Sequence, residues 1–202
     1  MSDSSIKRHI ATYTRMEDGT QEDYLLLREH NKPLLNNVAD RALAELVGLQ
    51  ETHPGNLIDR YQHSLQTATR AFRDNAEEEV VVAALLHDIG DLLAPANHAE
   101  FAADILKPYV SSSTYWIIAH HGIFQGYYFW HHIGGDRHAR EKFRGHPYFE
   151  QTVEFCHRWD QESFDPNYDT LPLTFFEPLV RRIFARQPWG EHTPEYLRRG
   201  SP

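Results

Sequence analysis

The sequence is poor in cysteine, in excess positive charge and in long apolar runs. Its one cysteine, Cys156, cannot form a disulfide within the chain, which fits a reducing compartment, and it excludes zinc sites built from several thiolates. Lys and Arg number 20 against 29 Asp and Glu, so the net charge of −9 has the wrong sign for binding nucleic acid through phosphate neutralisation. Residues 80–86 form the longest apolar run, far below the roughly 20 residues that cross a bilayer, and the N-terminal residues contain no apolar signal core. We therefore expect a soluble, cytoplasmic protein that binds neither nucleic acid nor membranes.

The length and the apolar content predict one domain. A chain of 202 residues, of which 41% are hydrophobic, can bury a sizeable core, and no internal repeat or low-complexity linker divides it. We expect a single domain over 1–202, with a core at about 34–186, an N-terminal extension at 1–32 and a tail at 187–202. The sequence leaves the oligomeric state open.

Apolar residues recur at three- and four-residue steps through most of the chain, which is typical of amphipathic helices. Together with capping residues and with glycine or proline stops, this spacing predicts helices over 33–48, 57–73, 75–90, 99–107, 111–122, 147–160 and 176–183. An aromatic-rich connection is expected between Gly122 and Gly135. We find no convincing alternating strand, so the predicted fold class is all-α.

Charged residues occur at positions that the pattern places in the core. The helix that contains the apolar run ends in His87-Asp88, and Asp160 follows apolar residues on one helical face. Burying a carboxylate or an imidazole costs several kcal/mol unless it is paired or coordinated, and a metal ion suits both groups. Since neighbouring helical residues diverge by about 100°, one of the pair can bind one ion while the carboxylate reaches a second. A hydrogen-bonded polar network is the alternative.

The order His63, then His87-Asp88 within "AALLHDIGD", then Asp160, resembles the HD-domain superfamily of helical metalloenzymes. The resemblance covers about residues 50–185 and implies an HD-domain helical bundle with a metal site in its core. The minimal pattern of this superfamily binds one metal and commonly serves phosphohydrolysis. This sequence has more, because His98 and the pair His120-His121 stand where two-metal members carry two further histidines.

Several segments resemble the mixed-valent diiron oxygenases, which include myo-inositol oxygenase and the organophosphonate-cleaving oxygenases. These segments are "HSLQTA", "LLHDIG", "HHGIFQGYY" and "FCHRWDQESFD". The resemblance implies two iron ions in a mixed-valent Fe(II)/Fe(III) state, with no catalytic residue beyond the metal centre. It places one iron on His63, His87, Asp88 and Asp160, and the other on Asp88, His98 and His121, with His120 as the alternative to His121. The second iron would keep open coordination positions.

The residues expected around the substrate depart from the pattern of these oxygenases. Asp91 and Gln125 stand where the relatives carry histidine or lysine, and His53 and Asn56 stand where the aminophosphonate enzyme carries tyrosine and glutamate. The aromatic-rich stretch near the last histidines must then supply contacts. Arg137 or Arg140 could bind an anion, and several rings could enclose a quaternary ammonium group or simply form core. The candidate substrate contacts are His53, Asn56, Asp91, Gln125, Tyr128 and Arg137, with Tyr127, Trp130, His131 and His132 nearby.

The resemblance predicts a non-haem diiron oxygenase whose partners are O₂ and a small hydroxylated substrate with a C–P or C–C bond to be cleaved. A 1-hydroxy-organophosphonate, giving a carboxylate and phosphate, is the leading substrate, and a polyol oxidised as by myo-inositol oxygenase is the alternative. Histidine and carboxylate ligands also accept other divalent ions. A phosphohydrolase of a nucleotide or small phosphate ester with Mn or Mg therefore stays open, as does a structural metal site without catalysis.

Overall fold

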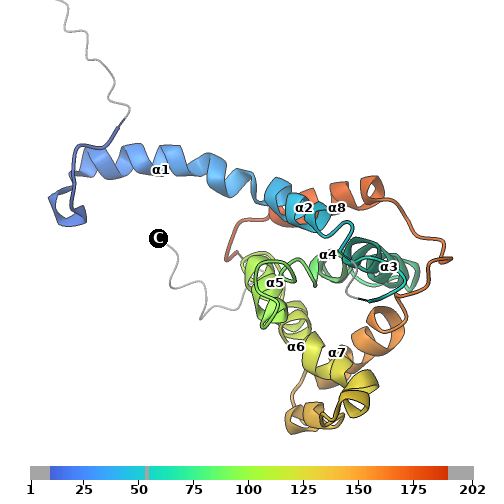
Figure 1. The fold of residues 1–202 in the computed structure, drawn as a ribbon. Coiled ribbons are helices and arrows are strands. Elements are labelled where there is room, and N and C mark those ends of the chain that lie inside the picture. The colour runs from blue at the N-terminus through green and yellow to red at the C-terminus, as the bar shows by residue number, and fades with distance from the viewer. Residues whose placement is uncertain (1–9, 53–54, 191–202) are drawn as a thin grey trace, which may run out of the picture. The chain divides into compact units, whose positions relative to one another are not determined.

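The structure, a computed structural model, describes residues 10–52 and 55–190, and within these ranges every regular element is helical (Figure 1). The all-α prediction is confirmed. No helix in the described ranges combines the length and the apolar character needed to cross a bilayer. The α-helices are α1 (Gln21–Asn36), α2 (Val38–Gly48), α3 (Arg60–Arg73), α4 (Glu78–Leu86), α5 (His98–Leu106), α6 (Ser112–Phe129), α7 (Phe149–Phe155) and α8 (Leu173–Phe184). Shorter turns are η1 (Met16–Asp18), η2 (Trp130–Ile133), η3 (Ala139–Phe143) and the π-helical η4 (Cys156–Asp160).

Two compact units divide the chain, residues 1–38 and residues 39–202. In the first unit, α1 begins at a capping box in which the Thr20 side chain accepts from the Asp23 backbone N–H and the Asp23 carboxylate accepts from the Thr20 N–H. The prediction that a helix begins at Pro33 is wrong, because this cap begins the helix earlier and Pro33 lies inside it. The predicted helix over 33–48 is accordingly two helices, of which the second, α2, begins at Val38.

The core of the second unit is built around α4. Its residues from Val81 to Leu86 are all apolar and no more than 1% exposed, so this part of the helix is apolar on every side. α3 and α8 pack against α4, and α5 and α7 pack against α6. The chain leaves α4 at His87, and the polar residues that follow therefore enter the centre of the protein.

Two helix boundaries differ from the prediction for local reasons. α6 continues through Gly122 and Gly126 to Phe129, because Trp130 packs over Gly126 and Phe124 is fully buried, and this packing outweighs the weak helix propensity of glycine. The aromatic stretch that was expected to be a connection is therefore largely helical. The predicted cap at Asn75 is not formed, because Asn75 has a φ of 59° and α4 begins three residues later, at Glu78.

A buried carboxylate on α4 ties the core to two other segments. Glu79 accepts hydrogen bonds from the Ser111 N–H (3.1 Å), the Thr114 hydroxyl (2.8 Å) and the Arg186 guanidinium (2.6 Å). Burial raises the pKa of Glu79, but the hydrogen bonds from Arg186, Ser111 and Thr114 outweigh it, so the pKa lies below its usual 4.5. The ionised carboxylate thus stabilises the fold.

We expect Glu79→Gln to lower the free energy of unfolding by about 2–3 kcal/mol at pH 7, because charge-assisted hydrogen bonds to a buried carboxylate are lost. A carboxyl with a lowered pKa stabilises the fold above its unfolded pKa and loses that contribution as the pH falls through its folded pKa. The gap between wild type and variant should therefore shrink as urea unfolding is repeated below pH 4.5. Glu77→Gln, at an exposed position just before α4, is the matched control, and an unchanged gap at low pH would contradict the assignment.

Candidate metal centre

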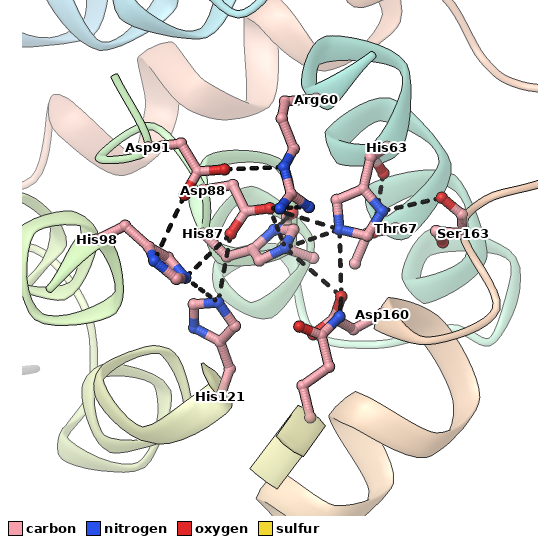
Figure 2. A network of polar contacts seen from close by, with 12 residues as sticks. Arg60, His63, Thr67, His87, Asp88, Asp91, His98, His121, Asp160 and Ser163 are labelled. Carbon is pink, nitrogen blue, oxygen red and sulfur yellow. Dashed lines mark hydrogen bonds and ion pairs between the residues drawn. The ribbon is translucent and has the colours of Figure 1, made fainter. Parts of the chain in front are cut away.

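Five segments bring six polar side chains to one place in the core (Figure 2). They come from α3, the turn after α4, the first residue of α5, the inner face of α6 and the end of η4. The structure therefore brings together all six residues expected as metal ligands, which are His63, His87, Asp88, His98, His121 and Asp160.

The first group of ligand atoms is enclosed by protein. The Nε2 atoms of His63 and His87 lie 3.2 Å apart, and Asp160 Oδ1 lies 3.2 Å from the former and 3.7 Å from the latter. Asp88 Oδ2 completes the group, at 3.5 Å from His63 Nε2 and 3.3 Å from His87 Nε2. None of these four residues is more than 3% exposed.

The second group shares Asp88 with the first. Asp88 Oδ1, the other oxygen of this carboxylate, lies 3.5 Å from His98 Nε2 and 3.3 Å from His121 Nε2, and these two nitrogens are 3.3 Å apart. His121 is buried, whereas the side chain of His98 is 27% exposed. One carboxylate thus presents one oxygen to each of two neighbouring groups, which is how a carboxylate bridges two ions.

Backbone carbonyls orient three of the four histidines. The Nδ1 atoms of His63, His87 and His121 lie 2.7–2.8 Å from the carbonyl oxygens of Ser163, Ala84 and Ile118. In the neutral rings Nδ1 then carries the hydrogen and donates it, so each Nε2 presents a lone pair to the cluster.

The cluster contains acceptors that lack donors. Lone pairs of imidazole nitrogens and carboxylate oxygens face one another at 3.2–3.7 Å, and Asp160 Oδ2 is buried with no hydrogen-bond partner. Such an arrangement is unfavourable unless cations lie between the atoms. The residues therefore fit two metal ions, and a ligand set of imidazole and carboxylate without thiolate suits Fe or Mn and permits other divalent ions.

The ionisation of the cluster agrees with this fit. Burial raises the pKa of Asp160, but hydrogen bonds from His63 and His87 outweigh it, and the net pKa lies below the usual 3.8. Burial lowers the pKa of His87, but the charge of Asp88 and hydrogen bonding to Asp160 outweigh it and raise the pKa well above 6.5. Without a metal the cluster therefore attracts protons, which metal binding displaces.

The π-helical turn η4 aims Asp160 at the cluster. The Gln161 N–H donates to the Cys156 carbonyl (3.0 Å), five residues back, so this turn is wider than an α-helical one. Asp160 and Cys156 are fully buried, whereas Val153, expected on the same face, is half-buried. Gln125 on α6 donates from its amide nitrogen to Asp160 Oδ1 (2.7 Å) and holds the carboxylate from the opposite side.

Asp91, expected to contact substrate, lies between the candidate ligand His98 and Arg60. Its Oδ1 is 3.4 Å from His98 Nδ1, and its Oδ2 is 2.9 Å from the Arg60 Nε. Arg60 also lies 3.5 Å from Asp88 Oδ2. The sequence analysis did not select Arg60, although its position three residues before His63 on α3 puts the two side chains on neighbouring parts of one helical face. Asp91 thus orients both His98 and Arg60.

Carboxylates that orient metal-binding histidines commonly strengthen metal binding by 10- to 100-fold. We therefore expect Asp91→Asn to weaken metal binding at the group that contains His98 by about that factor. Metal binding at the enclosed group of His63, His87 and Asp160 should not change. Titration of metal-free protein with Mn²⁺, followed by calorimetry, measures both sites. Asp104→Asn, an exposed change on α5, is the matched control. Equal weakening of both sites would show that Asp91 does not act through His98.

The second group borders a cavity of about 540 Å³. Asp88 and His98 line it at the metal centre, and Arg60, Gln125 and Lys142 supply polar groups. A further cavity of about 500 Å³ is lined by Asn56 and Tyr128, two of the expected substrate contacts, and by Gln125 and Arg60. The enclosed group lies behind these residues.

The remaining candidates lie away from the cluster or outside the described residues. His120 lines the larger cavity, but its Nδ1–H donates to the Trp116 carbonyl (2.9 Å) and its ring stacks on the Trp116 ring. Arg137 and Arg140 lie over the ring of Tyr127, at 4.2 and 3.9 Å from its centre, and a quaternary ammonium group cannot occupy the same positions. Trp130 lines the larger cavity, and the exposed rings of His131 and His132 contact each other. His53 lies outside the described residues.

Residues 60–155 match the family model of the HD domain. Five of the six clustered residues, from His63 to His121, fall within this segment, and Asp160 follows it closely. No curated protein gives a significant match to the chain. This segment is thus similar to the HD domain, and its buried histidines and aspartates form groups with Asp160 that can hold metal ions.

Proposed function

We propose that this HD-domain protein is a non-haem diiron oxygenase that uses O₂ to cleave the C–P bond of a small 1-hydroxy-organophosphonate. In that reaction the C–H and C–P bonds of the hydroxylated carbon break, that carbon is oxidised to a carboxylate, and phosphorus leaves as phosphate. One O₂ supplies both added oxygen atoms and accepts the four electrons, so the reaction needs no other oxidant.

The observation that carries this proposal is the asymmetry of the two groups that share Asp88. The group of His63, His87 and Asp160 is enclosed, whereas His98 in the other group is 27% exposed and borders the larger cavity. A substrate can approach only the second group directly. When bound, an iron pair would supply redox chemistry with O₂ and polarise the substrate oxygens.

The side chains of the larger cavity suit an anionic substrate. Arg60, held by Asp88 and Asp91, and Lys142 line this cavity and can donate charge-assisted hydrogen bonds to phosphonate oxygens. They would replace the lysine and histidine that the related oxygenases carry at positions 125 and 91. Phe129, Trp130 and Phe143 also line the cavity and supply apolar surface.

Metal analysis and EPR of protein from iron-supplemented cells, before and after limited reduction with ascorbate, test the proposal. We expect two irons per chain and a half-integer-spin signal from a coupled Fe(II)/Fe(III) pair, which added 1-hydroxyethylphosphonate perturbs. A signal perturbed by inositol and not by phosphonates would move the substrate to polyols. One metal per chain, no accessible mixed-valent state, or phosphate release without O₂ in Mn or Mg would overturn the oxygenase in favour of a phosphohydrolase.

A further inference from the structure

The smaller cavity is a second compartment beside the metal centre. It shares Arg60, Gln125 and Phe129 with the larger cavity, so the two compartments meet at these three side chains. Its volume of about 500 Å³ lies within the range of roughly 300–1,000 Å³ typical of small-molecule sites. A two-carbon phosphonate next to His98 would leave this compartment unfilled.

The walls of the smaller cavity consist of rings and amides. Tyr128, Phe129 and Phe164 are aromatic, and Phe164 is held in place by stacking on the His63 ring (4.5 Å between centroids). Asn56, Gln125 and Gln161 are amides. Of the described residues that line this cavity, Arg60 alone is charged, and no carboxylate is among them.

This lining favours an uncharged planar group. Aromatic walls pack well against a flat apolar ring. Arg60, the one charged residue among the described lining residues, is already paired with Asp88 and Asp91, so the described lining offers no carboxylate for an ammonium group to pair with. The amide nitrogens of Gln125 and Gln161 already donate to Asp160 and to the His157 carbonyl, which leaves the amide oxygens to accept from a ligand. An ammonium group is therefore poorly matched to this compartment.

We infer that the smaller cavity binds the far end of the substrate and that this end is an uncharged, planar group such as an aromatic ring. The inference rests on the proposed function, in which the acidic end lies near His98, Arg60 and Lys142. It predicts an aryl-substituted hydroxyphosphonate as the substrate class, with the aromatic ring and the acidic group on opposite sides of Arg60.

Calorimetry on Mn²⁺-loaded protein without O₂ tests this inference with three probes: 1-hydroxyethylphosphonate, 1-hydroxy-2-phenylethylphosphonate and its 2-trimethylammonio counterpart. We expect the phenyl probe to bind at least tenfold more tightly than the other two. Gln161→Trp, which fills the smaller cavity, should abolish that preference without changing the affinity of the hydroxyethyl probe. Gln151→Trp, the same change at an exposed position of α7, should keep it.

The inference would be overturned by equal affinities for the phenyl and hydroxyethyl probes or by tighter binding of the ammonium probe. It would also be overturned if no probe bound measurably, or if the phenyl preference survived in Gln161→Trp. These measurements need neither iron nor turnover, so they are independent of the EPR result. A phenyl preference with no mixed-valent iron would overturn the oxygenase alone, and a mixed-valent pair without that preference would overturn this inference alone.

Discussion

Replacing Asp88 with asparagine is expected to reduce the metal content from two ions per chain to at most one and to abolish O₂-dependent turnover. Each oxygen of this carboxylate lies 3.3–3.5 Å from the nitrogens of a different histidine pair. The amide that replaces it is neutral and has only one oxygen, so at most one group keeps its ligand. The amide hydrogens would instead bind the facing imidazole lone pairs.

Metal analysis by mass spectrometry and phosphonate-dependent O₂ uptake measure this result. Asp169→Asn, at an exposed position, is the matched control and should retain both ions. The variant should also lose the stabilisation that bound metal gives, about 2.7 kcal/mol for a ligand present at 100 times its dissociation constant. A variant that keeps two ions per chain would show that Asp88 does not bridge them.

His98→Ala is expected to leave one metal ion per chain and a kcat lowered by about three orders of magnitude. The enclosed group does not contain His98, and the partly exposed His98 side chain contributes little to the core. A metal that polarises a substrate oxygen contributes several kcal/mol to the transition state, and about 1.4 kcal/mol corresponds to a tenfold change in rate.

His120→Ala is the matched control for His98→Ala, because it removes another histidine that lines the larger cavity. His120 is bound to the Trp116 carbonyl and stacked on Trp116, so two ions should remain in that variant. Loss of one metal in His120→Ala, with both kept in His121→Ala, would reverse the assignment of the ligand between these neighbours. Loss of both metals in His98→Ala would show that the two sites are not separable.

The candidate metal-binding residues could be selected from the sequence because they break a strong local pattern. His87 and Asp88 end a helix that is apolar on every side, and Asp160 lies on an apolar face, so each is a buried charge that needs a partner. The resemblance to the HD-domain superfamily then added His63, His98 and the pair His120-His121. Whether His120 or His121 points inward depends on the rotation of α6, which the sequence alone did not settle, and the structure places His121 in the cluster.

The residues that line the two cavities were harder to select because they lie on segments whose course depends on tertiary packing. Lys142 reaches the larger cavity from η3, and Arg60 is an ordinary surface residue by its local pattern. Arg137 appeared suitable as an anion partner by proximity in sequence, but it lies over Tyr127 and is not among the residues lining either cavity. The length of α6 was underestimated for the same reason, since Gly126 is buried under Trp130 and neither glycine marks the end of the helix.

The wide turn η4 makes the candidate metal centre sensitive to the deletion of a single residue. A π-helical turn contains one more residue than the α-helical turn it replaces. Deleting one residue between Cys156 and Asp160 would restore a regular helix and rotate the carboxylate by about 100°, away from His63 and His87. The helix itself would survive such a deletion, so a well-folded descendant without this ligand lies one mutational step away from the present sequence.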